Sequence, residues 1–510
     1  MNYIIPIGGT GARVTRAIVF LAMAGCFNGE KFKIMCVDSD ESNGDVKRLE
    51  DVINTYQKLR KKLENEKLTN KEHNEYIFPE IVSAYIDKNA GKRLVWSPLS
   101  SEDTNSNMSM SEMVRESSMS NKIRDVYDFL YSKAERDKKL VGGFYGHTSI
   151  GSYFMAQQIV KDGKYTTVWE NFFNNINEKQ DKIFIIGSIF GGTGASGVPT
   201  IARIISEMEE TKNLPIGAIF LQPYFRPILK NDDNHALKID WNTFTTKTKT
   251  ALEYYSEQGY NNIFREMYFI GEDIDKFMVV KNNECGSTQE NKANIIEVIA
   301  ATALLDFISR DYSDNSNSFN TRFTEKVLRE NEKSTVIKKD ALKVSPSKDL
   351  FENIEKFLKF SILFNRYYYH LIKYNEQDIE FHYKDIDTET ADEMYRMCQN
   401  YVAWIRDIIV KTDDNGIVDY ENCNEDILWF NSKYTELFSS NVLESKVSGN
   451  KFFKFLQSRI YIYSELDNME NLTKEKEKQK KGEQLINDLS DKNGTGGLKS
   501  LIRDFNEICK

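Results

Sequence analysis

Short apolar runs alternate with helix-like patterns through roughly the first three hundred residues of the chain. The apolar runs predict strands at 3–7, 32–37, 183 onwards, 214–222 and 266–270. The stretch at 294–310 has helical spacing and is apolar nearly all round, which predicts a buried central helix. Strands that alternate with helices in this way are typical of an α/β fold with a parallel sheet.

Two of the predicted strands end in glycine-rich segments that lead into helix patterns. Gly8-Gly9-Thr10-Gly11-Ala12-Arg13 precedes a helix pattern at 14–24, and Gly191-Gly192-Thr193-Gly194-Ala195-Ser196-Gly197 precedes one with Pro199 expected in its first turn. Glycine lets the backbone approach a ligand, and the free N–H groups of a helix start favour anions. Both segments therefore predict phosphate contacts, although the lysine of a P-loop is missing.

An acidic segment, Asp38-Ser39-Asp40, ends the predicted second strand. Its carboxylates could contact a ribose or hold Mg²⁺ through water, and Asp is also a common residue at strand ends. A strand, a glycine segment, a helix and a following acid are equally typical of a dinucleotide-binding Rossmann unit. On this first unit alone, both interpretations stay open.

The order of the motifs resembles that of the tubulin/FtsZ superfamily. Its signature loop GGGTG[ST]G corresponds to 190–197 here, with Phe190 in place of the first glycine and Ala195 where Ser or Thr is usual. A third glycine-rich turn, 142–151, lies where the family places its γ-phosphate loop, and Asn294 falls where tubulins read the guanine edge.

The resemblance implies a Rossmann-like tubulin/FtsZ-type nucleotide-binding domain over 1–312, with an insertion at about 41–140, and a mainly helical region over 313–510. It implies GTP or GDP as the ligand, with Mg²⁺, and it implies a set of nucleotide-binding residues. These are Gly8, Gly9, Thr10, Gly11, Ala12, Arg13, Asp38, Asp40, Gly146, His147, Thr148, Ser149, Gly191, Gly192, Thr193, Gly194, Ala195, Ser196, Gly197 and Asn294.

The second half departs from the family. Helix-like patterns dominate at 350–374, 389–410, 425–438 and 446–465, and no acidic motif matches the one that completes a neighbouring GTPase site. We therefore expect a homo-oligomer or filament that assembles on GTP binding, with slow or absent hydrolysis and no assignable catalytic residue. Two alternatives remain: a nucleotide-sensing scaffold or defence protein that does not polymerise, and an NAD-binding Rossmann enzyme.

The composition limits which ligands and which cellular compartment we expect. The net charge of −9 over 510 residues disfavours nucleic acid as a general ligand. The six cysteines show no metal spacing, and no apolar run reaches the ~20 residues of a membrane span, so a cytoplasmic protein without a membrane partner is expected. The helix pattern at 45–67 predicts an exposed helix. The Ser-rich stretch 100–120 predicts a surface loop or, alternatively, a lid or partner-binding loop.

Overall fold

The computed structural model of the 510-residue chain describes most of the first 312 residues and selected elements beyond them. The described residues are 1–27, 29–65, 80–83, 85–87, 91–99, 108–137, 139–140, 144, 147–228, 241–271, 278–281, 291–312, 320–323, 350–367, 386–409, 411–412, 418–419 and 500–502.

A nine-stranded sheet forms the centre of the molecule, and all its strand pairs are parallel. The order is β15-β13-β11-β10-β1-β2-β4, with β3 beside β1 and β7 beside β3. The strands are β1 (Asn2–Ile7), β2 (Phe32–Ile34), β3 (Cys36–Val37), β4 (Ile81–Ser83), β7 (Val95–Trp96), β10 (Lys182–Ser188), β11 (Ile216–Leu221), β13 (Glu266–Ile270) and β15 (Asn320–Phe323). The chain runs outward from β1 in one direction, then returns and runs outward from β10 in the other, which is the doubly wound order of Rossmann-like folds.

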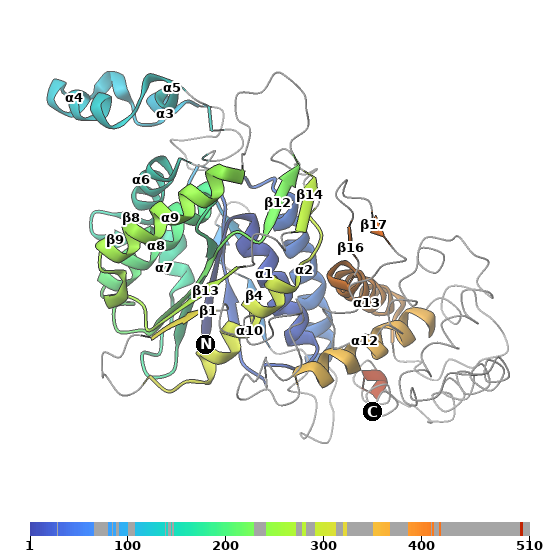
Figure 1. The fold of residues 1–510 in the computed structure, drawn as a ribbon. Coiled ribbons are helices and arrows are strands. Elements are labelled where there is room, and N and C mark those ends of the chain that lie inside the picture. Colours follow the sequence, from blue (N-terminus) through green and yellow to red (C-terminus); the bar gives the residue numbers. More distant parts are fainter. Residues whose placement is uncertain are drawn as a thin grey trace.

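Helices cover both faces of this sheet (Figure 1). Along β1, Ile4 packs into one apolar cluster, whereas Tyr3, Ile5 and Ile7 pack into the other, as strand alternation requires. The first cluster holds α1 (Gly8–Met23), α2 (Gly44–Asn65), α10 (Ile295–Ser309), α12 (Leu350–Tyr367) and α13 (Thr388–Ile409). The second holds α6 (Thr148–Ile159), α7 (Thr167–Phe172), α8 (Gly192–Glu207), α9 (Trp241–Glu257) and the 3₁₀ turn η2 (Tyr260–Asn262).

Four small two-stranded sheets complete the described strands. They are β5 (Tyr85–Asp87) with β6 (Gly91–Arg93), β8 (Val160–Lys161) with β9 (Lys164–Tyr165), β12 (Phe225–Ile228) with β14 (Met278–Lys281), and β16 (Lys411–Thr412) with β17 (Val418–Asp419).

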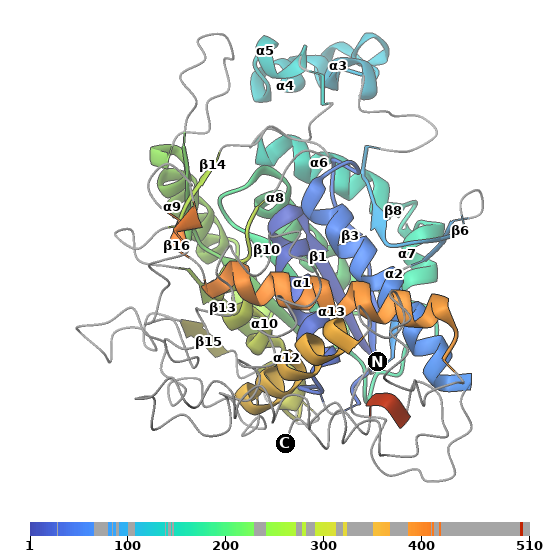
Figure 2. The same cartoon turned by 90° about the vertical axis from the view of Figure 1, so that its right-hand side faces the viewer.

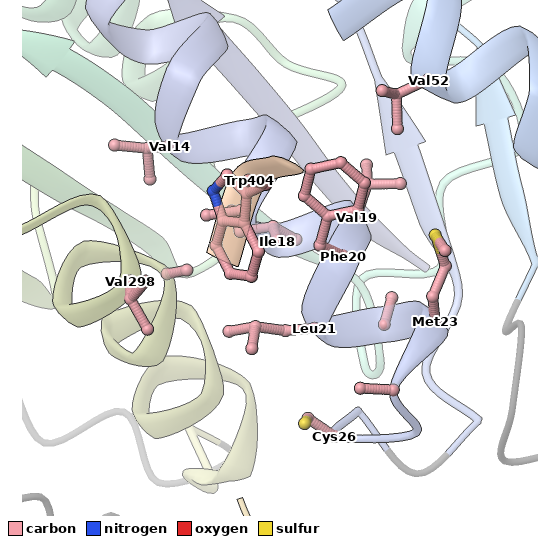
Figure 3. Packing of buried hydrophobic residues seen from close by; sticks show 14 of the residues in the cluster. Val14, Ile18, Val19, Phe20, Leu21, Met23, Cys26, Val52, Val298 and Trp404 are labelled. Atoms are coloured by element: carbon pink, nitrogen blue, oxygen red, sulfur yellow. The ribbon is translucent and has the colours of Figure 1, made fainter. Parts of the chain in front are cut away.

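The C-terminal helices lie across the α1 and α2 side of the domain (Figure 2). Trp404 of α13 packs on Phe20 of α1 with ring centroids 5.0 Å apart, within the apolar cluster of Figure 3. Tyr401 contacts Phe357 of α12 with centroids 4.7 Å apart. Most of the described residues beyond 312 belong to these two helices, in the places that the pattern predicted. The predicted helices at 425–438 and 446–465 lie outside the described residues.

The segment 41–140 is only partly separate from the domain. The helix expected to be exposed at 45–67 is α2, and it buries Val46, Leu49, Ile53 and Tyr56 against the core, so that expectation was wrong for one of its faces. The strands β4 and β7 of the same segment belong to the main sheet.

The last part of this segment, residues 108–137 and 139–140, forms what we call the projecting unit. It comprises α3 (Met110–Met113), the 3₁₀ turn η1 (Glu116–Ser118), α4 (Asn121–Leu130) and α5 (Lys133–Arg136). These helices lie at one end of the molecule in both views (Figures 1 and 2), and Glu135 of α5 contacts His147 at the start of α6. The stretch from 108 to 120, expected as a loop, contains the two short helical segments α3 and η1, and Met110 and Met113 are buried. The residues 100–107 lie outside the described part.

Candidate functional site

The glycine-rich segments meet where the strand order reverses. Strands β1 and β10 are neighbours in register from Asn2 with Lys182 to Ile7 with Gly187. The helix after β1 packs on one face of the sheet and the helix after β10 packs on the other. In open α/β sheets, the crevice beyond the carboxyl ends of two such strands is the usual ligand site.

Both helices begin earlier than the sequence pattern suggested. Helix α1 starts at Gly8 and α8 at Gly192, so the predicted loops are in fact the first turns of the two helices. Neither N-cap residue, Ile7 nor Gly191, makes a side-chain capping bond. The amides of Gly8–Thr10 and of Gly192–Gly194 consequently have no partner within their helices, which leaves two positively polarised helix ends at the crevice.

The glycines of these turns serve two different purposes. A Cβ on Gly11 would lie 2.6 Å from the carbonyl oxygen of Ile186, and one on Gly194 would collide with the backbone of Ser188. Those glycines let the helices approach the strands. Gly8 instead has a φ of +73°, and a Cβ on Gly191 would meet only the hydroxyl of Ser188 at 3.0 Å. Gly8 therefore provides a left-handed backbone conformation at the start of α1, next to Thr193, and Gly191 is the half-buried position where a side chain would meet little.

The remaining members of the two segments differ in exposure. Gly9, Thr10, Gly192 and Thr193 are half-buried at the helix starts. Ala12, Ala195, Ser196 and Gly197 are buried within the helices. The hydroxyl of Ser196 donates to the carbonyl oxygen of Gly192 at 2.7 Å, so this side chain is used inside α8.

Pro199 lies in the interior of α8 and not in its first turn. Proline has no N–H to donate to the carbonyl four residues earlier. The hydroxyl of Tyr255, on α9, donates to that carbonyl, the oxygen of Ala195, at 3.3 Å. Tyr255 thus replaces the hydrogen bond that the proline removes and ties α9 to the start of α8.

The acidic segment lies beside both helix starts. The hydroxyls of Ser39 and Thr193 are 3.1 Å apart, and Val37 pairs with Ile7 directly before Gly8. Oδ1 of Asp38 accepts the amide of Asp40 at 3.1 Å, and Oδ1 of Asp40 accepts the hydroxyl of Ser42 at 2.6 Å. The Oδ2 atoms of both aspartates are buried without a hydrogen-bond partner within the described structure.

Two buried carboxylate oxygens without partners carry an energetic cost that a bound cation or hydroxyl would remove. Burial, opposed by the Asp40 amide and aided by the Asp40 carboxylate, raises the pKa of Asp38 to about 7. Among the described residues no group of three or more His, Cys, Asp or Glu could hold a metal alone. Two carboxylates suit Mg²⁺ that is also held by phosphate oxygens and water.

Arg13 points into the contact between α1 and α10, and its guanidinium lies over the rings of Tyr224 and Phe225, just after the carboxyl end of β11. Its guanidinium forms an ion pair with Glu297 and donates to the carbonyl oxygen of Lys292 at 2.6 Å. Although burial disfavours its charge, Glu297 raises the pKa of Arg13. Sequence reasoning missed Glu297, because no local pattern links two residues so far apart in the chain.

The other residues in the implied set have different placements. Asn294 caps α10, with its Oδ1 accepting the amide of Ile296 at 2.9 Å. His147 caps α6 through its backbone, and its Nδ1 lies 3.0 Å from Oε1 of Glu135 in the projecting unit. Thr148 and Ser149 are exposed in the first turn of α6, and Gly146 lies outside the described residues. Helix α6 packs closely on α8, where a Cβ on Gly151 would lie 2.8 Å from that of Ser196.

The strand order and the two glycine-rich helix starts define an α/β protein of the doubly wound, Rossmann-like class. No family model matches the chain, and no curated protein matches its sequence. Among solved structures it is similar to TubZ of Bacillus thuringiensis serovar israelensis, in a GTPγS-form protofilament, at 12% identity and a TM-score of 0.20. That match spans 53% of this chain and 47% of the TubZ chain, so about half of each is compared. In the described part of the chain, no helix is long and apolar enough to cross a bilayer.

Proposed function

We propose that this chain is a tubulin-like protein that binds a guanine nucleotide between the starts of α1 and α8 and self-associates when GTP is bound. The observation that carries the proposal is the pairing of two uncapped, glycine-rich helix starts at the reversal of strand order. A lone glycine-rich turn is common in dinucleotide-binding domains, whereas two of them in the tubulin order support the tubulin-like interpretation.

The backbone performs most of the binding in this proposal. Amides of Gly8–Thr10 donate to one phosphate group and those of Gly192–Gly194 donate to the next, each helped by its helix dipole. Near the position of a Cβ on Gly191 lies only the Ser188 hydroxyl, which is free to rotate as a phosphate approaches. Asp38 and Asp40 flank Ser39, which contacts Thr193 at the start of α8, and each has a buried Oδ2 without a partner in the described structure. These two oxygens would hold Mg²⁺, which would supply positive charge against the phosphates.

Hydrolysis is not assigned to any residue of this chain. Phosphoryl transfer requires an oriented water in addition to charge stabilisation. In the described residues Glu297 forms an ion pair with Arg13, so this carboxylate is already used and we do not propose it as a water-orienting acid. We therefore propose slow or absent turnover.

Titration calorimetry tests the ligand. With Mg²⁺ present, we expect GTP and GDP to bind more tightly than ATP, and NAD to give no measurable heat. A preference for ATP would remove the guanine claim, and a preference for NAD would replace the proposal with its alternative.

One observation favours that alternative. Asp38 follows the second strand of a Rossmann-ordered sheet and has a free oxygen, which is where such domains hold a ribose hydroxyl. A dinucleotide-binding enzyme would need phosphate contacts only at α1, however, and would leave the glycine-rich start of α8 without a purpose. The sensor or defence scaffold shares the same site and differs only in whether the chain assembles.

A further inference from the structure

Asn43 lies where the acidic segment, the start of α2 and the start of α1 meet. Its Oδ1 accepts the amides of Asp45 at 2.9 Å and of Val46 at 3.4 Å, so the side chain caps α2. Its own backbone amide donates to the carbonyl oxygen of Asp40 at 3.1 Å. Asn43 therefore joins the acidic segment to the helix that follows it.

The same side chain lies against the first turn of α1. A Cβ on Gly9 would be 3.0 Å from Nδ2 of Asn43 and 3.2 Å from its Oδ1. Gly9 has no positive φ, so its backbone conformation does not require glycine, and glycine is unfavourable within a helix. The close approach of the Asn43 carboxamide accounts for the glycine at this position.

The nitrogen of this carboxamide is a free donor beside the unpaired amides of Gly8–Thr10. Asn43 is half-buried, and among the described residues its Nδ2 finds no hydrogen-bond acceptor, whereas Oδ1 is occupied by the start of α2. The bonds of Oδ1 fix the orientation of the group, so only N–H donors are left for a ligand. Donors suit an anion, in contrast to the free oxygens of Asp38 and Asp40, which suit a cation.

We propose that Asn43 is a phosphate-binding residue of the candidate site, with its Nδ2 group donating to the phosphate that the amides of α1 hold. The inference rests on the proposed nucleotide site and adds a side-chain contact to it. The buried Oδ2 atoms of Asp38 and Asp40, which have no partner in the described structure, are a separate sign that a ligand belongs beside this segment. A hydrogen bond to a charged group is stronger than one between neutral groups, so the loss of this donor should lower affinity measurably.

Titration calorimetry with GDP and Mg²⁺ on the full-length protein tests the proposal. Asn43→Asp keeps the shape of the side chain and its cap on α2, because Asp and Asn cap helices about equally well, but it removes both donors. We expect an unchanged melting temperature and GDP binding at least about tenfold weaker. Asn177→Asp is the matched control, since Oδ1 of Asn177 likewise accepts a backbone amide, that of Lys179 at 3.1 Å, shortly before the amino end of β10.

A neutral substitution separates the lost donors from the added charge. In Asn43→Ser the side chain still caps α2, but its hydroxyl is too short to reach the position of Nδ2. We expect this variant to bind GDP roughly threefold more weakly than the wild type and more tightly than Asn43→Asp. If Asn43→Ser binds GDP as tightly as the wild type, the proposal is overturned, because the added charge alone would then explain the effect of the aspartate.

The wild-type titration distinguishes a failure of this inference from a failure of the proposed function. A wild type that binds no GDP removes the proposed function, and the role of Asn43 with it. A wild type that binds GDP, while Asn43→Asp binds it equally well or more tightly, overturns only the role of Asn43, because the side chain would then face solvent or a metal ion.

Discussion

Two glycines of the same motif have different structural roles in this chain. Gly194 is the centre of the signature-like segment, yet its missing side chain makes room for the backbone of Ser188 and not for a ligand. At Gly191, at the edge of the segment, an added Cβ would meet only the movable hydroxyl of Ser188 at 3.0 Å. Substitutions at these two positions should therefore have opposite effects on stability and binding.

We expect Gly191→Val to abolish nucleotide binding with a change in unfolding free energy of less than about 1 kcal/mol, since only a movable hydroxyl lies nearby. Gly194→Val should cost about 3 kcal/mol or more, because the backbone of β10 cannot give way easily. Chemical denaturation and calorimetry on both variants check this. Full binding by Gly191→Val would mean that the phosphates lie elsewhere.

Asp38 should make stability depend on pH. Its pKa of about 7 lies above the ~3.9 of an unfolded chain, so the folded protein binds more protons between these values. The stabilisation from the protonated form is complete below about pH 4 and is lost as pH rises through 7. Without metal or nucleotide, the unfolding free energy should fall from about pH 4 to about pH 7, by up to about 4 kcal/mol from this group. Asp38→Asn should remove this part, and an unchanged profile in that variant would contradict the assignment.

Among the elements, those with strong periodicity could be predicted from the sequence. The strand at 266–270 and the central helix agree with β13 and α10 to within a residue at each end. The two- to four-residue strands β4, β7 and β15 could not be predicted, because so short a run has no measurable period and pairs only through its sheet neighbours. The helix starts at Gly8 and Gly192 were also missed, since glycine is a poor helix former that the packing on β1 and β10 overrides here.

The candidate site was predictable to a similar degree. The sequence indicated which segments meet, because parallel strands present their carboxyl ends at one edge. It could not show that Arg13 would pair with Glu297, or that Asn294 would cap its own helix. Such side-chain choices depend on contacts between distant residues.

The bond between α9 and α8 provides a test at the level of elements. Tyr255→Phe should cost about 1–2 kcal/mol of unfolding free energy, since it leaves the buried carbonyl of Ala195 without a donor. In a Pro199→Ala background, the new backbone amide can donate to that carbonyl, so the same substitution should cost less. A double-mutant cycle measures this difference, and additive effects would show that Tyr255 does not compensate for the proline.

For the whole molecule, the central question is whether ligand binding and assembly are linked. A nucleotide that binds the assembled state more tightly promotes assembly without being hydrolysed. We expect GTP and a slowly hydrolysed analogue to give similar pelleting on sedimentation, with little phosphate release. A chain that binds GTP and still does not pellet would favour the sensor, and fast phosphate release would reveal a catalytic acid outside the described residues.

The central strand pair also has a consequence for the growing chain on the ribosome. Strand β1 is made first, but its partner β10 follows about 180 residues later. At ~5–20 residues per second, one edge of β1 stays open for roughly ten seconds or longer while its other neighbours, β2 and β3, are already available. An apolar strand with an open edge is prone to pair with other chains. The two helix starts of the candidate site directly follow β1 and β10. The site is therefore complete only after β10 has paired with β1 and covered the open edge.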